Sequence, residues 1–254
     1  MIAAERYKLI LKELEVKDHV TVAELKSLLN VSIDTVRRDL QYLESLNKLQ
    51  KVHGGAVSER DVATNQAFIK RKMKFIERKR ELSSFAVRLV KEHQAISLNA
   101  GTTNIELAKY LTTQFERLTV ITNSLKVADL FTHKPGFTVI VPGGTLNHEE
   151  FSLYGLSIEE QIAKFNIDTA FISINAISLE KGLTDFRQGE SEVINAMIRS
   201  AEKAVVVADS SKFETMSYLN ICGLDQIHAI VTDSQIDEQL LEAYENHKVT
   251  IINH

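Results

Sequence analysis

The sequence predicts an α/β protein with an N-terminal winged helix-turn-helix and a mostly parallel-sheet, Rossmann-like second domain. Two observations carry this prediction. The first sixty residues hold short segments whose apolar residues have helical spacing. From residue 94 onward, short apolar runs alternate with amphipathic helical stretches, which is typical of a parallel sheet covered on both faces. We therefore divide the chain into a winged helix-turn-helix domain over 1–60, a basic linker over 61–80 and an α/β domain over 81–254.

Capping residues mark the predicted N-terminal helices. Residues 4–15 form a first helix by their apolar spacing. Thr21 is a plausible N-cap for a second helix, which Asn30 ends, and Ser32 can cap a third helix that reaches residue 45 or 46. Two short helices joined by a tight turn, the second with paired arginines, favour a helix-turn-helix.

The third helix is predicted to bury one face and to present the other to DNA. Val36, Leu40 and Leu43 follow one another at i, i+4 and i+7 and form the buried face. The residues that we expect to meet DNA are Ser32, Asp34, Thr35, Arg37, Arg38 and Gln41. For Arg37, which lies on the flank, the alternative is an ion pair inside the domain with Glu44 or Asp39.

A β-hairpin wing is predicted over residues 48–58, because the Gly54-Gly55 pair permits a tight turn between apolar positions. Lys48, Lys51 and His53 would then lie near the backbone of bound DNA. The alternative is an ordinary surface hairpin.

Charge is distributed unevenly along the 254 residues, whose net charge is −4. Residues 1–80 hold 17 Lys and Arg against 11 Asp and Glu, whereas residues 81–254 hold 13 against 23. This asymmetry suggests a basic nucleic-acid end, although chance variation along a mixed surface would also produce it. The basic stretch 68–80 could support DNA binding, contact a second subunit or form a solvated face on a connecting helix.

Seven apolar runs predict the strands of the second domain, and five amphipathic stretches predict helices between them. The runs are residues 95–100, 118–122, 137–141, 168–174, 204–209, 229–233 and 249–253. The helical stretches are residues 105–111, 124–131, 157–165, 190–203 and 236–244.

Polar residues follow the carboxyl ends of these strands, where open α/β sheets bind ligands. The loop after the first strand, with Gly101, Thr102 and Thr103, precedes a helix and favours an anion such as phosphate. Lys212 would supply a positive charge opposite that loop. Asp185, Arg187 and Glu190 could receive sugar hydroxyls. Each of these residues also has a purely structural alternative as a turn former, a cap or a surface charge.

The chain resembles the DeoR family of bacterial transcription regulators. The resemblance rests on the segment 32–40, Ser-x-x-Thr-Val-Arg-Arg-Asp-Leu, followed by His-Gly-Gly-Ala at 53–56. Motifs of the second half match as well: NAGTT (99–103), VITNS (120–124), PGG (142–144), DTAF (168–171), GLT (182–184) and DSSKF (209–213).

The resemblance implies a repressor of carbohydrate metabolism whose sensor domain is similar to ribose-5-phosphate isomerase and glucosamine-6-phosphate deaminase and responds to a phosphorylated sugar. It implies that Asn99, Gly101, Thr102 and Thr103 form the phosphate loop. It also implies Asn123, Gly144, Asp209 and Lys212 as pocket positions. Together with Asn175, Asp185 and Glu190 they complete the effector-binding residues that we predict. The chain departs from the family at 173–176, where glycines are usual, and at Ile194, where lysine is expected. These departures leave the effector's identity open.

Three hypotheses about function follow. The first is a ligand-controlled repressor, active as a homodimer or homotetramer on double-stranded operator DNA. The second is a sugar-phosphate isomerase or deaminase fused to a DNA-binding module, although the aspartate-rich catalytic loop of those enzymes is replaced here by Asn175-Ala176. The third is a constitutive DNA-binding protein with a vestigial pocket. We expect a cytoplasmic protein with no membrane span, no metal and no cofactor. A single cysteine, Cys222, and an N-terminus without a signal-peptide core suit that expectation.

Overall fold

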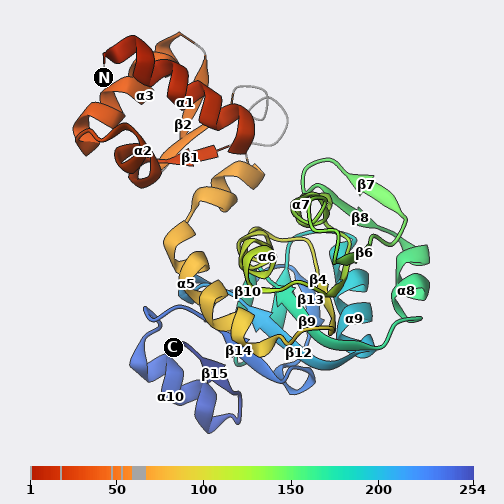
Figure 1. Cartoon of the computed structure of the whole chain (residues 1–254). Coiled ribbons are helices and arrows are strands. Elements are labelled where there is room, and N and C mark those ends of the chain that lie inside the picture. The colour runs from red at the N-terminus through yellow and green to blue at the C-terminus, as the bar shows by residue number, and fades with distance from the viewer. Residues whose placement is uncertain (1, 18, 47, 53, 59–66) are drawn as a thin grey trace. The chain divides into compact units, whose positions relative to one another are not determined.

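The structure is a computed structural model that describes residues 2–17, 19–46, 48–52, 54–58 and 67–254. The chain divides into two compact units, Met1–Lys74 and Phe75–His254 (Figure 1). The division lies inside the segment 61–80 that the sequence suggests as a linker. Among the helices described, none is both long enough and apolar enough to cross a membrane.

The first unit is a helix-turn-helix with a β-hairpin wing, as predicted. Its helices are α1 (Ala3–Lys17), α2 (Val22–Leu29) and α3 (Ile33–Ser45), and residues 67–73 are also helical. Its three strands form an antiparallel sheet in the order β1 (His19–Thr21), β3 (Gly55–Ser58) and β2 (Leu49–Val52).

The predicted caps define the turn between α2 and α3. Thr21 Oγ1 accepts a hydrogen bond from the backbone N–H of Glu24 at 3.0 Å, and the Glu24 carboxylate accepts one from the Thr21 N–H at 2.8 Å, which completes a capping box. Asn30 ends α2 in the left-handed conformation with φ 51°. Ser32 caps α3 by accepting from the Thr35 N–H at 3.2 Å. All three local predictions are confirmed.

The inward face of α3 contains one charged residue that apolar spacing does not predict. Val36, Leu40 and Leu43 are buried as expected, but so is Asp39. Its carboxylate accepts two hydrogen bonds from Arg6 of α1, at 2.6 Å from Nε and 2.9 Å from Nη2. This bidentate pair joins α1 to α3 and satisfies the buried charge.

Gly55 is required by the close approach of β3 to β1. The two strands of the wing pair from Leu49 to Val52, and Gly54, at φ +88°, lies in the turn between them. A Cβ atom on Gly55 would lie 2.0 Å from the carbonyl oxygen of Val20. A side chain at this position would therefore push β3 away from β1.

The second unit is built on a seven-stranded parallel sheet in the order β15-β14-β12-β9-β4-β5-β6. Each strand overlaps one of the seven predicted runs, although β9 begins one residue and β12 three residues before its run. The strands are β4 (Ala95–Leu98), β5 (Thr119–Thr122), β6 (Thr138–Ile140), β9 (Ile167–Ser173), β12 (Ala201–Val207), β14 (Ala229–Val231) and β15 (Ile251–Ile252). The chain builds outward from β4 to β6, then returns to the other side of β4 to add β9 and the remaining strands. The strand order thus reverses between β4 and β9.

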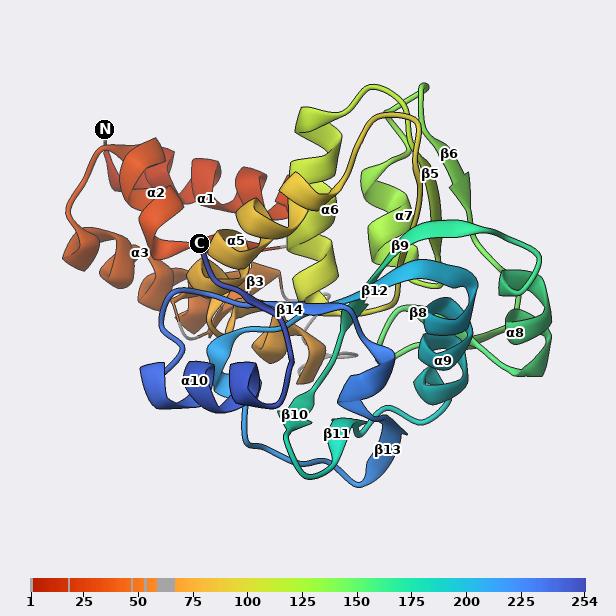
Figure 2. The same ribbon diagram turned by 90° about the horizontal axis from the view of Figure 1, so that it is seen from below.

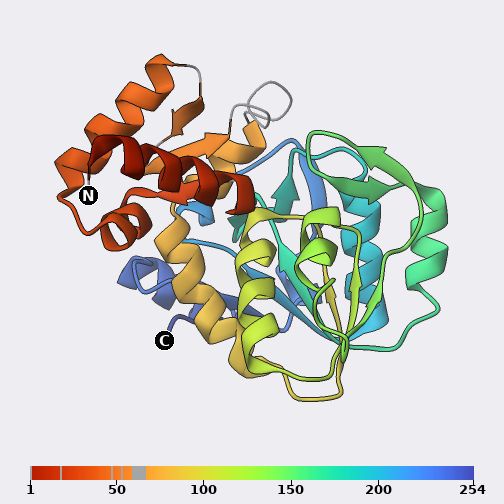
Figure 3. The same cartoon turned by 45° about the horizontal axis from the view of Figure 1, so that its top comes forward.

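Helices cover both faces of this sheet, as predicted. One face carries α5 (Ile76–Ala86), α6 (Thr102–Gln114) and α7 (Leu125–Leu130); the other carries α8 (Leu156–Ile162), α9 (Glu190–Ser200) and α10 (Glu238–Asn246) (Figure 2). Figure 3 shows α5, α6 and α7 side by side over the sheet. Three short 3-10 helices complete the unit: η1 (Val87–Leu89), η2 (Ser210–Lys212) and η3 (Leu224–Gln226).

Two small antiparallel sheets lie outside the predicted pattern. They are the hairpin of β7 (Thr145–Asn147) with β8 (Ser152–Tyr154), and the sheet of β10 (Ala176–Ser178), β11 (Gly182–Asp185) and β13 (Leu219–Cys222). The predicted helix over 190–203 is also too long. It ends at Ser200, because residues from Ala201 onward already pair with β9.

Replacing Gly55 by alanine is expected to destabilise the first unit by about 1–3 kcal/mol, since the new Cβ overlaps a backbone oxygen that cannot move alone. Urea-dependent hydrogen exchange, read in peptides from residues 2–58, measures this loss. Gly54→Asn is the matched control: apart from its chain neighbours, no atom of the described residues lies within 4 Å of its Cβ position, and asparagine tolerates positive φ better than other side chains. Equal stability of Gly55→Ala and the wild type would contradict the close-packing argument.

Candidate functional site

The outward face of α3 is exposed along its length. Asp34, Arg37, Arg38 and Gln41 are exposed, and Thr35 is half-buried beside the cap. Arg37 lies 3.8 Å from Asp34, and both side chains are largely in solvent, with 67% and 81% of their surface exposed. The ion pair that the sequence suggests for Arg37 is not formed with either alternative partner: Asp39 binds Arg6, and Glu44 accepts from the Lys51 N–H. The arginine pair therefore faces solvent, where DNA could reach it.

The wing adds positive charge to the same unit. Lys48 and Lys51 are exposed, on either side of the start of β2. His53, the third predicted wing contact, lies outside the described residues.

In the second unit, the predicted effector residues gather where the strand order reverses. The carboxyl ends of β4 and β9 meet at this switch point, which is where open α/β sheets leave room for a ligand. The loops that follow these strands hold Asn99 to Gly101 and Ile174 to Asn175.

Asn99 ties the two strand ends together. It is fully buried, its Nδ2 donates to the carbonyl oxygen of Ser173 at 2.9 Å, and its Oδ1 accepts from the Ser173 N–H at 2.7 Å. Asn104 of α6 donates to the Asn99 carbonyl oxygen at 2.9 Å. Both polar atoms of the Asn99 side chain thus already bond the protein, so this residue shapes the loop.

The Gly101–Thr103 segment forms the amino end of α6. Gly101 is the N-cap, and its carbonyl oxygen accepts the first helical bond from Ile105 at 3.2 Å. The next backbone N–H groups have no acceptor inside the helix and carry the positive end of its dipole. A Cβ at Gly101 would lie 2.2 Å from Ser173 Oγ, so only glycine fits against β9.

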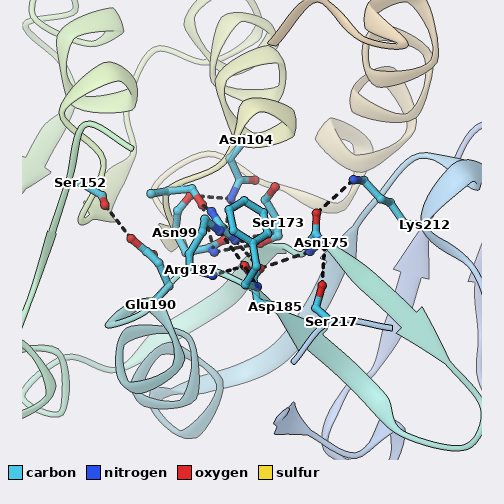
Figure 4. Close-up of polar contacts among 12 residues, drawn as sticks. Asn99, Asn104, Ser152, Ser173, Asn175, Asp185, Arg187, Glu190, Lys212 and Ser217 are labelled. Carbon is cyan, nitrogen blue, oxygen red and sulfur yellow. Dashed lines mark hydrogen bonds and ion pairs between the residues drawn. The ribbon is translucent and has the colours of Figure 1, made fainter. Parts of the chain in front are cut away.

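A buried arginine crosses the switch point. Arg187 donates from Nη1 to the carbonyl oxygen of Ala100 at 2.5 Å and from Nη2 to that of Ser173 at 3.2 Å (Figure 4). Asp185 holds it in a bidentate pair, at 2.9 Å to Nε and 2.6 Å to Nη2. The guanidinium thereby bonds the loops after β4 and β9 at once.

The two charges of this pair stabilise each other. Burial alone would raise the pKa of Asp185, but the Arg187 guanidinium and the N–H groups of Phe186 and Arg187 outweigh it and hold that pKa below its usual value. Burial likewise disfavours the charged arginine, and the nearby Asp185 and Glu190 carboxylates reverse the effect, so the pKa of Arg187 is raised. Both groups stay charged at neutral pH.

Glu190 forms the second buried acidic position. It is the first residue of α9, and its carboxylate accepts from Ser152 Oγ at 2.6 Å and from Asn123 Nδ2 at 3.1 Å. Burial raises the pKa of Glu190 despite the Arg187 charge nearby. Asn123 also accepts from the Ala100 N–H at 2.8 Å, so Glu190 is linked to the loop after β4.

In Figure 4, Lys212 and Glu190 lie on opposite sides of Arg187. Its Nζ donates to Asn175 Oδ1 at 3.4 Å, and Asn175 Nδ2 donates to Ser217 Oγ at 2.6 Å. Asp209 caps the short helix η2 by accepting from the Ser211 N–H at 3.2 Å, so it positions Lys212 through the backbone.

The last predicted effector residue, Gly144, does not take part in the hydrogen bonds described for the other positions. Gly144 lies before β7, where a Cβ would sit 2.5 Å from the Tyr154 carbonyl oxygen, so its position is dictated by the hairpin. Sequence reasoning also missed Ser152, Ser173 and Ser217 as partners, because none carries a motif. Arg187 stands in the sequence as a partner for sugar hydroxyls, yet the structure buries it as a crosslink.

Comparison with known proteins adds the family. Residues 6–62 match the model of the DeoR-like helix-turn-helix domain, and residues 74–234 match the DeoR C terminal sensor domain. The chain belongs to the DeoR family. As a member, it is a DNA-binding transcriptional regulator. The fold and the family membership predicted from its motifs are confirmed.

Relatives match this DeoR-family protein over nearly its whole length. The HTH-type transcriptional regulator GolR of Listeria innocua is 34% identical, over 97% of this chain and 96% of that protein. The transcriptional repressors GlcR of Bacillus subtilis and CsqR of Escherichia coli are 31% and 30% identical, over 99% and 97% of this chain and 96% and 94% of their own lengths. Among solved structures, ribose 5-phosphate isomerase A from Methanocaldococcus jannaschii has a TM-score of 0.39 at 18% identity, over 53% of each chain.

Replacing Arg187 by methionine is expected to destabilise the second unit by about 3–5 kcal/mol at pH 7, because Asp185 is left buried without its counter-charge. The loss should shrink toward pH 4. The depressed pKa of Asp185 stabilises the wild type above the usual carboxyl pKa and stops doing so as pH falls. In the variant, protonation relieves the unpaired charge.

Urea unfolding of the wild type and the variant, followed by circular dichroism, measures the loss of stability at pH 7 and at pH 4. Asp185→Asn combined with Arg187→Met serves as the control and should recover part of the stability at pH 7. A pH-independent loss would mean that the pair does not act through charge.

Proposed function

We propose that this regulator represses genes of carbohydrate metabolism and that a phosphorylated sugar, bound at the switch point, controls its affinity for operator DNA. The observation that carries the proposal is a chain of hydrogen bonds that links the loop before α6 to Lys212. Arg187 bonds the Ala100 carbonyl oxygen and Asp185, Asp185 accepts from the Asn175 N–H, and Asn175 accepts from Lys212. Two of its relatives are named as repressors, which supports the direction of control.

A phosphate is the chemistry that this edge favours. The free N–H groups at the start of α6 and the ammonium of Lys212 are both attractive to an anion. Asn175 and Ser217 offer amide and hydroxyl groups beside Lys212, which suits sugar hydroxyls. The buried groups Asn99, Asp185 and Arg187 would act behind this surface by holding the two loops in place.

Regulation is favoured over catalysis because the carboxylates are already occupied. Asp185 binds Arg187, Glu190 binds Ser152 and Asn123, and Asp209 caps η2. A general acid or base must reach the proton that it transfers. Conversion of ribose-5-phosphate or glucosamine-6-phosphate by the purified protein would favour the enzyme hypothesis instead.

On the DNA side, we propose that two copies of the chain present their α3 helices to a symmetric operator in the cytoplasm. Arg38, Asp34 and Gln41 would meet base edges, with Arg37 on the flank. Lys48 and Lys51 would contact the phosphate backbone.

Arg38→Ala is expected to weaken operator binding about 5- to 150-fold, the range for one lost arginine contact to a base. The melting temperature should stay within about 1 °C, because Arg38 is exposed and makes no core contact. Fluorescence anisotropy on a duplex selected by the protein from a random-sequence pool measures the affinity. Lys12→Ala, an exposed lysine of α1, is the control for simple charge loss. Unchanged affinity of Arg38→Ala would remove this residue from the DNA contacts.

Lys212→Ala is expected to abolish the effector response and to preserve DNA binding. A thermal-shift screen of the full chain with ribose-5-phosphate, glucosamine-6-phosphate, fructose-6-phosphate and inorganic phosphate, repeated with operator DNA present, identifies the response in the wild type. Lys203→Ala, at the far end of β12, is the matched control. A panel that shifts neither the melting temperature nor the operator affinity would favour constitutive DNA binding, and a retained response in Lys212→Ala would place the phosphate elsewhere.

A further inference from the structure

One side chain of α5 contacts the loop that carries Lys212. Arg78 donates from Nη1 to Ser210 Oγ at 3.0 Å. Ser210 and Lys212 are the first and last residues of the three-residue helix η2. This contact bridges 132 positions of sequence and is not part of the sheet or of the polar cluster described above.

Ser210 is held firmly on its other side. Its N–H and its Oγ both donate to the Asp233 carboxylate, at 2.7 and 3.0 Å, and Asp233 is buried after β14. The Ser210 hydroxyl thus gives its proton to Asp233 and its lone pair to Arg78. Any movement of η2 changes the geometry of both bonds at once.

Arg78 also contacts the residue that opens the second unit. Its guanidinium lies 4.4 Å from the centroid of the Phe75 ring. Phe75 directly follows Lys74, the last residue of the first unit, and it adopts the left-handed conformation with φ 55°. This conformation is uncommon for a bulky residue, so its neighbours must hold it. Arg78 is one such neighbour.

We infer that Arg78 couples occupancy of the Lys212 loop to the backbone at Phe75, where the chain passes from the DNA-binding unit to the sensor unit. The inference rests on the proposed function. An anion at the α6 amino end would attract the Lys212 ammonium, and a helix of only three residues moves as one piece. Ser210 would then shift against Arg78, and Arg78 would shift against the Phe75 ring.

This coupling requires two states that the ligand distinguishes. A displacement of η2 on ligand binding would change the Arg78–Ser210 hydrogen bond, so the ligated and free forms would hold the Arg78 side chain of α5 differently. The strained backbone at Phe75 gives α5 a place where a small change of direction can be absorbed. Arg78 is therefore a positioning residue, which touches neither the proposed ligand nor DNA.

The test compares the full chain with Arg78→Ala, Ser210→Ala and the double variant. Thermal shift gives the affinity for ribose-5-phosphate, glucosamine-6-phosphate, fructose-6-phosphate and inorganic phosphate. Anisotropy gives operator affinity with and without the probe that binds best. Arg88→Ala is the matched control, since Arg88 also lies over a phenylalanine ring, at 5.4 Å from that of Phe85, and is exposed.

We expect Arg78→Ala to bind the probe within threefold of the wild type, while the probe-induced change in operator affinity falls at least tenfold or to none. Ser210→Ala should do the same, and the double variant should lose no more than either single variant. Arg88→Ala should respond like the wild type.

Other outcomes distinguish a failure of the proposed function from a failure of the inference about Arg78. A wild type that binds no probe would overturn the proposed function and this inference with it. A wild type that responds, together with an Arg78→Ala variant that responds equally, would overturn the inference alone. A tenfold loss of probe affinity in Arg78→Ala would also overturn it, since Arg78 would then support the binding loop instead of transmitting its state.

Discussion

The Arg187–Asp185 pair is the interaction on which the sensor unit depends. β4 and β9 are neighbouring parallel strands, and the chain that follows each of them leads to helices on opposite faces of the sheet. Such a switch point leaves a gap beyond the carboxyl ends, and backbone groups in that gap need partners. One guanidinium supplies them by bonding the carbonyl oxygens of Ala100 and Ser173, and its charge is tolerated there because Asp185 lies beside it. Asn99 adds a second crosslink between the same loops. The position of the α6 amino end follows from these bonds.

This arrangement also explains why polar residues at the switch point differ in role. Those under the loops are buried and already hydrogen-bonded: Asn99 to the backbone of Ser173, Asp185 to Arg187, and Glu190 to Ser152 and Asn123. The groups named in the proposal are different: the first backbone N–H groups of α6 have no acceptor inside the helix, and Lys212 donates to Asn175. The buried residues therefore hold the two loops in place.

In both units, a buried aspartate is neutralised by a bidentate arginine. In the first, Asp39 on the inward face of α3 receives both hydrogen bonds of the Arg6 fork from α1. In the second, Asp185 receives the Arg187 fork. In each case a bidentate arginine fixes an angle as well as a distance, so the pair orients the element that it holds. In α3 this leaves Arg37 and Arg38 on the outer face.

The sequence by itself determined the features that depend on neighbours along the chain. The caps at Thr21 and Ser32, the apolar stripe of α3 and the seven strands of the parallel sheet all follow from local chemistry and periodicity. The family motifs are likewise read along the chain. Only the tertiary structure decided what depends on distant partners. Asp39 and Arg187 are charged residues that local patterns assign to the surface, and both are buried. Asp39 is neutralised by Arg6 of another helix, and Arg187 bonds the distant carbonyl oxygens of Ala100 and Ser173 while the nearby Asp185 balances its charge. Gly55 likewise matters through a carbonyl oxygen of another strand. Burial and pairing across the fold are long-range properties, and spacing along one segment carries no record of them.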